Sequence, residues 1–287
     1  MTCHAFRYSG TYHPDGPSGS RIAAIRDTWK NLVPEGVDLK FFFGRGGDTP
    51  KDDEVFLDVH DAFFASTSKV QAILKYAYDN EYDYVLQCDD DVFVNVPLVL
   101  ASDFAKYDYS GNASNPGGSN VPFSFVCNFG VWFSRKAMEH IIRSDVGYSD
   151  FDSEFDLEEY RSLSNVDKAR WHADLWNGQT LAAYGIVAHH DDNYVIGPGC
   201  LGCGSFYPEL CRAYVVHLAS IELMHELYRK VTNDLLGVDD IQPPAAVAQH
   251  SPEPAKATPP EAPTEPRKLE TAKRTLRDHS SGRWNGR

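Results

Sequence analysis

Residues 82–94, YDYVLQCDDDVFV, combine an apolar run with three consecutive carboxylates. The run at 84–88 is apolar and β-favouring, which predicts a buried strand. Asp89, Asp90 and Asp91 follow at the carboxyl end of that strand. In an open α/β sheet, ligands bind at this edge. The stretch therefore predicts both a core strand and a ligand site at its end.

Three adjacent carboxylates repel one another unless they are solvated or share a cation. Hard oxygen ligands favour Mg²⁺ or Mn²⁺, and these ions usually act together with substrate phosphates. Side chains alternate along a strand, so Asp89 and Asp91 are expected to project together while Asp90 points elsewhere. The pattern predicts a D-x-D site for a cation and a nucleotide diphosphate. The alternative is an acidic loop before a helix that begins near Pro97.

The order of apolar patterns along the chain indicates the fold class. Strand and helix patterns alternate through the first hundred residues, which predicts an α/β fold with a largely parallel, Rossmann-like sheet flanked by helices. The expected strands cover 2–6, 37–43, 54–59, 84–88, 123–134 and 214–216, and the expected helices cover the segments around 21–29, 66–77, 97–107, 174–184 and 221–231.

Composition divides the chain into a body and a tail. Residues 1–242 are long enough for one large domain, whereas 243–287 are rich in Pro, Ala, Glu and Lys and are expected to be disordered. The net charge is −14, and the tail holds 8 Lys and Arg against 5 Asp and Glu, which leaves −17 on the body. Such an acidic body repels nucleic acid, so no nucleic-acid partner is expected.

The DDD stretch resembles that of the β1,3-glycosyltransferases of the galactosyltransferase and Fringe type, glycosyltransferase family 31, in which DDD follows a DYV strand. Other segments resemble motifs of that family in the same order. The chain departs from the family at Ala173, where Glu is usual. The matching segments are RIAAIRDTW at 21–29, DVHDAFFASTSK at 58–69, FGVWFS at 129–134 and DLWNG at 174–178, and His217 stands where a late His is expected.

The resemblance implies a GT-A type fold, a UDP-sugar donor and Mn²⁺ or Mg²⁺ as the cofactor. It implies that Asp91 and His217 hold the cation, while Asp89 contacts the ribose or the water shell of the metal. Asp90 is expected to line the same donor site. Without the resemblance, His217 at the end of a short strand is read as a structural residue or as part of the zinc pattern described below.

Three further residues are candidates for donor binding. Arg26 either binds the diphosphate or pairs with a nearby carboxylate on the helix surface. Asp61 belongs to the 58–69 segment that resembles the family. Lys69 lies in the first turn of its helix, where the dipole disfavours a cation unless an anion is near, so either a phosphate or a structural carboxylate is expected beside it.

Asp174 is the candidate general base. Direct displacement at an anomeric carbon needs a base that deprotonates the acceptor hydroxyl from the side opposite the leaving diphosphate. The spacing from Asp174 to Gly178 resembles the family motif. The alternative is an ordinary helix N-cap, a position that Asp favours.

A cysteine pattern late in the chain permits two other interpretations. Cys200, Cys203, Cys211 and His217 spell C-x₂-C-x₇-C-x₅-H, which is compatible with a zinc knuckle. In an oxidising compartment, two of these cysteines would instead form a disulfide.

The function expected from these features is inverting transfer of a hexose or N-acetylhexosamine from a UDP-sugar to a hydroxyl of a glycan or glycoconjugate. The alternatives are a metal-dependent phosphoesterase and a non-catalytic relative that binds carbohydrate or nucleotide. No apolar run approaches the ~20 residues that span a bilayer, which favours a soluble, cytoplasmic protein. A Golgi or secretory location is the alternative if an anchor is missing from this chain. The donor sugar, acceptor and oligomeric state are not indicated.

Overall fold

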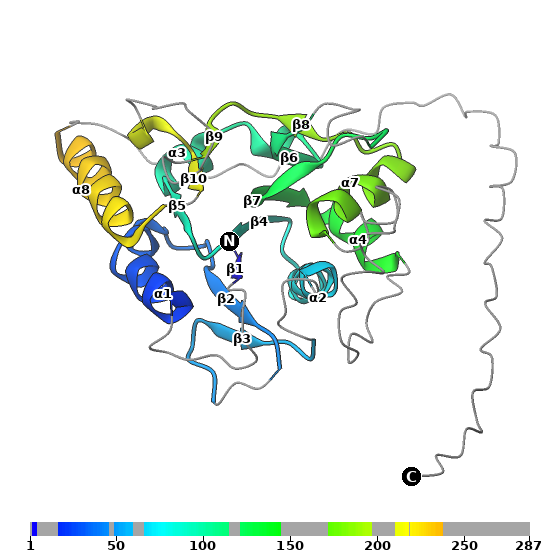
Figure 1. Ribbon diagram of the computed structural model, residues 1–287, viewed down its shortest axis with the longest axis horizontal. Helices are drawn as coiled ribbons and strands as arrows, with labels where there is room; N and C mark the ends of the chain where they lie inside the picture. The colour runs from blue at the N-terminus through cyan, green and yellow to red at the C-terminus, as the bar shows by residue number, and fades with distance from the viewer. Residues whose placement is uncertain are drawn as a thin grey trace, which may run out of the picture. The chain divides into compact units, whose positions relative to one another are not determined.

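A seven-stranded mixed sheet runs through the centre of the computed structural model (Figure 1). Its strand order is β3-β2-β1-β4-β7-β6-β8, with parallel pairing from β3 to β4 and between β6 and β8, and antiparallel pairing on both sides of β7. The expected α/β class with a largely parallel sheet is confirmed. The strands are β1 (Thr2–His4), β2 (Lys40–Phe43), β3 (Glu54–Phe56), β4 (Tyr84–Asp89), β6 (Tyr109–Ala113), β7 (Val126–Ser134) and β8 (His189–His190).

The structure describes residues 2–4, 17–45, 49–59, 66–114, 121–144, 172–196, 210–217 and 219–237, with backbone alone for 2–4, 17–19 and 211. All of them belong to one compact unit, Met1–Gln242. The expected tail at 243–287, Asp61, Cys200 and Cys203 lie outside the described residues. Among the described helices, none is long and apolar enough to cross a membrane.

A second, three-stranded sheet has the order β5-β10-β9, built from β5 (Val92–Val94), β10 (Val215–His217) and β9 (Tyr194–Ile196). β10 pairs antiparallel with β5 and parallel with β9. The chain enters this sheet directly from the end of β4, through the turn at Asp90 and Asp91. The aspartate triplet therefore lies where the large sheet passes into the small one.

Helices cover the sheets in two groups (Figure 1). α1 (Pro17–Asp27) packs beside α8 (Ile221–Gly237), and α2 (Ser66–Asp79), α4 (Arg135–Arg143) and α7 (Ala173–Ala183) pack together elsewhere. The apolar stripe expected on α2 is buried. Val70, Leu74 and Ala77 belong to the core formed with α4 and α7, and Ile73 is also fully buried.

The helix expected over 97–107 is wrong in its extent. α3 (Val96–Ala101) stops after six residues, and a separate 3₁₀ turn, η3 (Phe104–Lys106), follows. At the end of α3, the Ser102 Oγ and backbone N–H donate to the Val99 carbonyl oxygen at 2.7 and 3.4 Å, which satisfies a carbonyl at the helix C-terminus. Strands β2 and β3 are likewise shorter than the 37–43 and 54–59 expected, whereas α8 extends beyond residue 231.

Arg26 joins α1 to the start of β3. Its guanidinium donates from Nε to Asp53 Oδ2 at 3.0 Å and from Nη2 to Asp53 Oδ1 at 2.6 Å, and Nη2 also donates to Glu54 Oε1 at 2.7 Å. Lys30 donates to the same Asp53 carboxylate. Burial alone would raise the pKa of Asp53, but the hydrogen bonds and charges of Arg26 and Lys30 outweigh it and hold that pKa at about 2. This cluster ties the first helix to the sheet edge.

We expect Asp53→Asn to lower the free energy of unfolding by about 1–3 kcal/mol at neutral pH, because charged hydrogen bonds to Arg26 and Lys30 are lost. The native pKa lies below the ordinary 3.8, so the stabilisation is complete above 3.8 and declines as the pH falls toward about 2. Urea denaturation of both proteins across that range measures the difference. The exposed neighbour Asp52 provides the control Asp52→Asn, and a difference that does not shrink with acid would contradict the assignment.

Candidate functional site

The pairing of β5 with β10 places His217 beside the aspartate triplet. His217 lies opposite Val92, the residue that follows Asp91. The chain after β10 is also tied back, since the Ala219 backbone N–H donates to the Asp91 carbonyl oxygen at 2.8 Å. Segments 125 residues apart in sequence are thereby held against each other by backbone hydrogen bonds.

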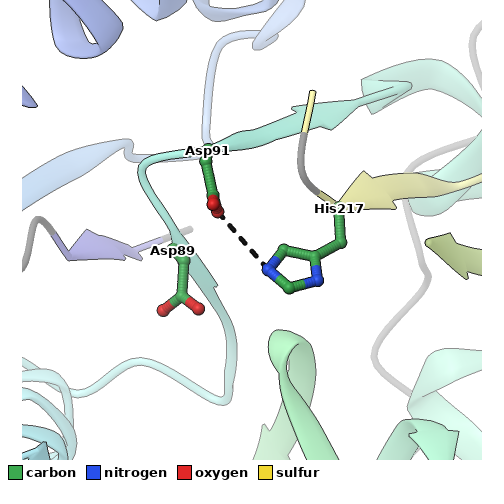
Figure 2. Close-up of side chains that lie close together, drawn as sticks. All are labelled: Asp89, Asp91 and His217. Atoms are coloured by element: carbon green, nitrogen blue, oxygen red, sulfur yellow. Dashed lines mark ion pairs between the residues drawn. The ribbon is translucent and has the colours of Figure 1, made fainter. Parts of the chain in front are cut away.

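Asp89, Asp91 and His217 form one cluster of possible metal ligands. Their ligand atoms all lie within 4.8 Å of one another. Figure 2 shows the two aspartates at either end of the turn after β4, with the imidazole of His217 facing Asp91. Asp91 Oδ1 lies 3.5 Å from His217 Nε2.

The donor atoms of this cluster fit a divalent cation. Within the described part of the chain, the buried Asp91 Oδ1, which faces His217 Nε2, has no hydrogen-bond partner. Leaving such an atom unpaired costs about 1–3 kcal/mol. Carboxylate oxygens together with one imidazole nitrogen form a set that suits Mn²⁺ or Mg²⁺ better than a thiolate-preferring ion.

Burial and mutual repulsion shape the charges of the cluster. Burial raises the pKa of Asp89 well above its ordinary value, the charges of Asp91, Asp90 and Asp174 raise it further, and Lys69 opposes them. Burial also lowers the pKa of His217. The imidazole is therefore neutral near pH 7, which is the form that ligates metals. A bound cation would relieve the repulsion around Asp89.

Asp90 points away from this cluster toward α1. Its Oδ1 lies 3.3 Å from Arg21 Nη1, and the residue is almost fully buried. The Arg21 guanidinium is also close enough to contribute to the lowered pKa of His217. The grouping expected of the triplet is thus present, with Asp89 and Asp91 gathered and Asp90 turned aside. The sequence did not single out Arg21 as a site residue.

A cavity of about 290 Å³ opens beside the cluster, and we call it the donor cavity after the donor site that the sequence predicts at this edge of the sheet. It brings together Asp89, His217 and Asp174, the first two from the cluster and the third from the first turn of α7. Burial raises the pKa of Asp174, against the backbone N–H of Leu175 and the charge of His172. The remaining lining residues are Ser66, Cys127, Asn128, Phe129, His172, Ala173 and Ile196.

Strand β7 supplies three lining residues, of which the sequence noted only Phe129, as part of a motif. The Phe129 ring stacks on the His217 imidazole with centroids 4.5 Å apart and planes 3° apart, which holds the imidazole in one orientation. Among the described residues, the buried Oδ1 of Asn128 has no partner. Burial and the charge of Asp174 raise the pKa of Cys127 to about 11, so its thiol is neutral and a poor nucleophile.

The other predicted donor residues have different surroundings. Lys69 is fully buried, and its charge lowers the pKa of Asp89, which places the ammonium near that carboxylate. Arg26 does not join the cluster, because Asp53 and Glu54 bind its guanidinium. Asp61 lies outside the described residues.

Gly178 seats α7 against the segment before β7. A Cβ at Gly178 would come within 2.5 Å of Phe125 Cβ and 2.7 Å of the Ser124 carbonyl oxygen. The absence of a side chain thus lets the helix approach closely, and the first turn of that helix carries Asp174. The glycine of the DLWNG segment therefore sets the depth of Asp174 in the donor cavity.

These features define a mixed α/β domain with a candidate divalent-cation site beside a carboxylate-lined cavity. No protein-family model matches the chain, and no curated protein is significantly similar to it. Among solved structures, the chain is similar to a glycosyltransferase involved in the glycosylation of the major capsid of PBCV-1, with a TM-score of 0.38 and 13% identity over 80% of this chain and 98% of that chain. A likeness of that strength does not establish a shared fold or activity.

We expect Gly178→Ala to destabilise the protein by about 1–3 kcal/mol, because overpacking at Phe125 and Ser124 outweighs the helix-propensity gain of about 1 kcal/mol. Urea denaturation measures the change. Gln179→Ala, at the next helical position, is the control and should change stability by less than about 0.5 kcal/mol. A stabilised Gly178→Ala protein would contradict the close approach described above.

Removal of a cluster ligand should weaken Mn²⁺ binding at least about tenfold. The free Mn²⁺ signal in electron paramagnetic resonance, titrated into chelator-treated protein, measures the affinity without any need for turnover. Asp91→Ala and His217→Ala test the cluster, and Asp79→Ala, an exposed carboxylate paired with Lys75, is the control. Equal affinity in all four proteins would show that the cluster is not the binding site.

Proposed function

We propose that this protein is an inverting, Mn²⁺-dependent glycosyltransferase of the GT-A type, which moves a hexose or N-acetylhexosamine from a UDP-sugar to a hydroxyl of a glycan or glycoconjugate. One observation carries the proposal. Two residues of the candidate cation cluster, Asp89 and His217, share a cavity with the partly buried carboxylate of Asp174. The motif resemblances support the same class, and the β1,3 linkage is proposed on their basis alone.

In the proposed donor site, Asp91 and His217 hold Mn²⁺, or Mg²⁺, and Asp89 contacts the ribose or the metal's water shell. The chemistry supplied by a bound divalent cation is neutralisation of charge on the departing diphosphate. Arg21 adds positive charge beside the cluster, and Asp90 orients Arg21 through their 3.3 Å ion pair. In an acidic domain, these positive charges are what allow an anionic nucleotide-sugar to approach.

Asp174 is proposed to deprotonate the acceptor hydroxyl. The acceptor oxygen then attacks the anomeric carbon from the face opposite the diphosphate, and the configuration inverts. A raised pKa suits this role, because a base is most effective when its pKa approaches the working pH. Asn128 lines the same cavity with an amide that has an unpartnered buried oxygen in the described structure, and it is proposed to bind a sugar hydroxyl.

Ala173 favours a second candidate, a non-catalytic relative that binds nucleotide or carbohydrate. The family that the sequence resembles usually has Glu there, whereas this chain has a buried methyl group lining the cavity. If the protein is catalytic, Asp174 must activate the acceptor hydroxyl without the help of a Glu at position 173. The catalytic candidate is expected to transfer the sugar and the non-catalytic candidate is not, whereas both are expected to bind the donor.

The substitution Asp174→Asn distinguishes the catalytic candidate from the non-catalytic one. If Asp174 is the base, kcat for transfer from UDP-sugars falls by about 10²–10⁴, because general-base catalysis contributes a factor of that size. UDP binding in the presence of Mn²⁺, measured by calorimetry, should remain unchanged. The activity of the unmodified protein should fall on acidification at a higher pH than an ordinary Asp would give, because its base has a raised pKa.

Asp108→Asn removes a partly buried carboxylate that pairs with Lys136, and it serves as the control for Asp174→Asn. A fall of only a few-fold in kcat would eliminate Asp174 as the base. Mn²⁺-dependent UDP binding with no transfer across a broad acceptor panel would indicate the non-catalytic relative. Absence of UDP binding under any condition would overturn the donor assignment.

A further inference from the structure

A second cavity of about 320 Å³ shares no lining residue with the donor cavity. It lies among the end of α3, the η3 turn and the strands β6, β8, β9 and β10, which run close together in Figure 1. We call it the distal cavity. Its lining residues are Ala101, Ser102, Asp103, Phe104, Tyr107, Ser110, His189, Asp191, Tyr194 and Tyr214.

The two cavities lie at opposite ends of one parallel strand pair. Tyr194 begins β9 and Tyr214 precedes β10, and both line the distal cavity. Ile196 and His217, which end the same strands and pair with each other, line the donor cavity. Three residues of strand separate Tyr214 from His217, or about 10 Å at about 3.3 Å per residue. A ligand in the distal cavity therefore occupies a site separate from the chemistry.

The aromatic walls of the distal cavity are held in place by other rings. Tyr107 stacks on His189 with centroids 3.5 Å apart and planes 7° apart. Phe104 stacks on Trp132 at 3.9 Å, and the Trp132 indole N–H donates to the Tyr194 hydroxyl at 2.8 Å. Because these rings are already fixed, the protein loses little side-chain conformational entropy when a ligand packs on them.

Polar groups with remaining hydrogen-bonding capacity sit between the rings. Asp191 Oδ1 accepts from the backbone N–H and side-chain Nδ2 of Asn193 at 2.9 and 2.8 Å, and Asp103 Oδ2 pairs with Lys106 at 2.7 Å. A carboxylate has about four acceptor positions, so both can accept further hydrogen bonds. Burial and these two carboxylates raise the pKa of Tyr214, whose hydroxyl therefore stays protonated and can donate.

This combination selects one chemical class of ligand. The Asp191 carboxylate repels phosphates, no Lys or Arg is among the described residues that line the cavity, and Lys106 beside the cavity is already paired with Asp103. Neutral hydroxyl groups, in contrast, donate well to carboxylates, and the C–H faces of a sugar ring pack against aromatic rings. The volume lies in the range of about 300–1,000 Å³ that small-molecule sites occupy.

We propose that the distal cavity is a non-catalytic subsite that binds a neutral sugar residue of a glycan. Binding there does not depend on transfer. That the bound glycan is the acceptor, retained near the donor cavity, rests on the proposed function. Tyr107 provides the packing face, while Asp103 and Asp191 accept hydrogen bonds from the sugar hydroxyls.

Saturation-transfer-difference NMR tests this with the methyl glycosides of glucose, galactose, mannose and N-acetylglucosamine. The full chain is used in EDTA without nucleotide, so that the cation cluster contributes nothing. At least one glycoside should bind, and Asp191→Asn should weaken it at least about fivefold, because a charged acceptor is lost while an oxygen remains for the Asn193 N–H. Tyr107→Ser should weaken it similarly by removing the packing face.

Two substitutions serve as matched controls for this experiment. Asp192→Asn changes the adjacent, fully exposed carboxylate, and Tyr184→Ser removes another tyrosine stacked on a histidine, His140, outside the distal cavity. Both controls and Asp91→Ala should bind the glycoside as the unmodified protein does. Binding that survives both Asp191→Asn and Tyr107→Ser, or that disappears with Asp91→Ala, overturns the proposal, as does no binding of any glycoside in the panel.

The result is independent of the proposed function. Glycoside binding at the distal cavity without any sugar transfer supports the subsite and leaves the protein a carbohydrate binder. Transfer activity without glycoside binding at the distal cavity supports the enzyme and refutes the subsite.

Discussion

The antiparallel pairing of β5 with β10 is the constraint on which the candidate site depends. It places His217 opposite Val92, so that an imidazole from late in the chain faces a carboxylate at the end of β4. The hydrogen bond from the Ala219 backbone N–H to the Asp91 carbonyl oxygen stabilises the same register. A slip of one residue would turn His217 to the other face of the small sheet and disperse the cluster.

Electrostatic strain is concentrated where this pairing brings the acids together. The carboxylates of Asp89, Asp91 and Asp174 act on one another in partly buried surroundings, and Lys69 offsets only part of that repulsion. Elsewhere the protein neutralises its acids directly, as Arg26 does for Asp53 and Glu54. Among the described residues, the candidate site thus gathers several carboxylates with little compensating charge beside them, and a site of this kind is suited to a cationic cofactor.

The sequence predicted correctly those features that depend on neighbouring residues in the chain. The strand before the aspartates follows from its apolar run, and the buried stripe of α2 follows from a periodicity of 3.6 residues. Asp90 does point away from Asp89 and Asp91, but it does so in the turn between β4 and β5 and not through alternation along a strand. Features set by distant neighbours were missed. Arg26 was open to two interpretations because its partners, Asp53 and Glu54, lie at the start of β3, far along the chain. Asn128 gave no signal because a strand pattern does not show which end lines a cavity. The end of α3 at Ala101 was missed because the residues that follow, Ser102 and Asp103, include no Gly or Pro to mark it.

Consecutive residues of β7 contact the walls of both cavities. Phe129 stacks on His217, and a Cβ at Gly130 would come within 2.9 Å of the Tyr194 ring. A substitution at Phe129 therefore affects the wall of the donor cavity, and one at Gly130 affects the wall of the distal cavity, in addition to the core. Few substitutions in this strand are expected to be tolerated. Divergent homologues should therefore vary in the loops around the cavities and keep a small residue at position 130. Under the proposed function, changes in sugar preference are then expected to arise from changes in those loops, while the strand is retained.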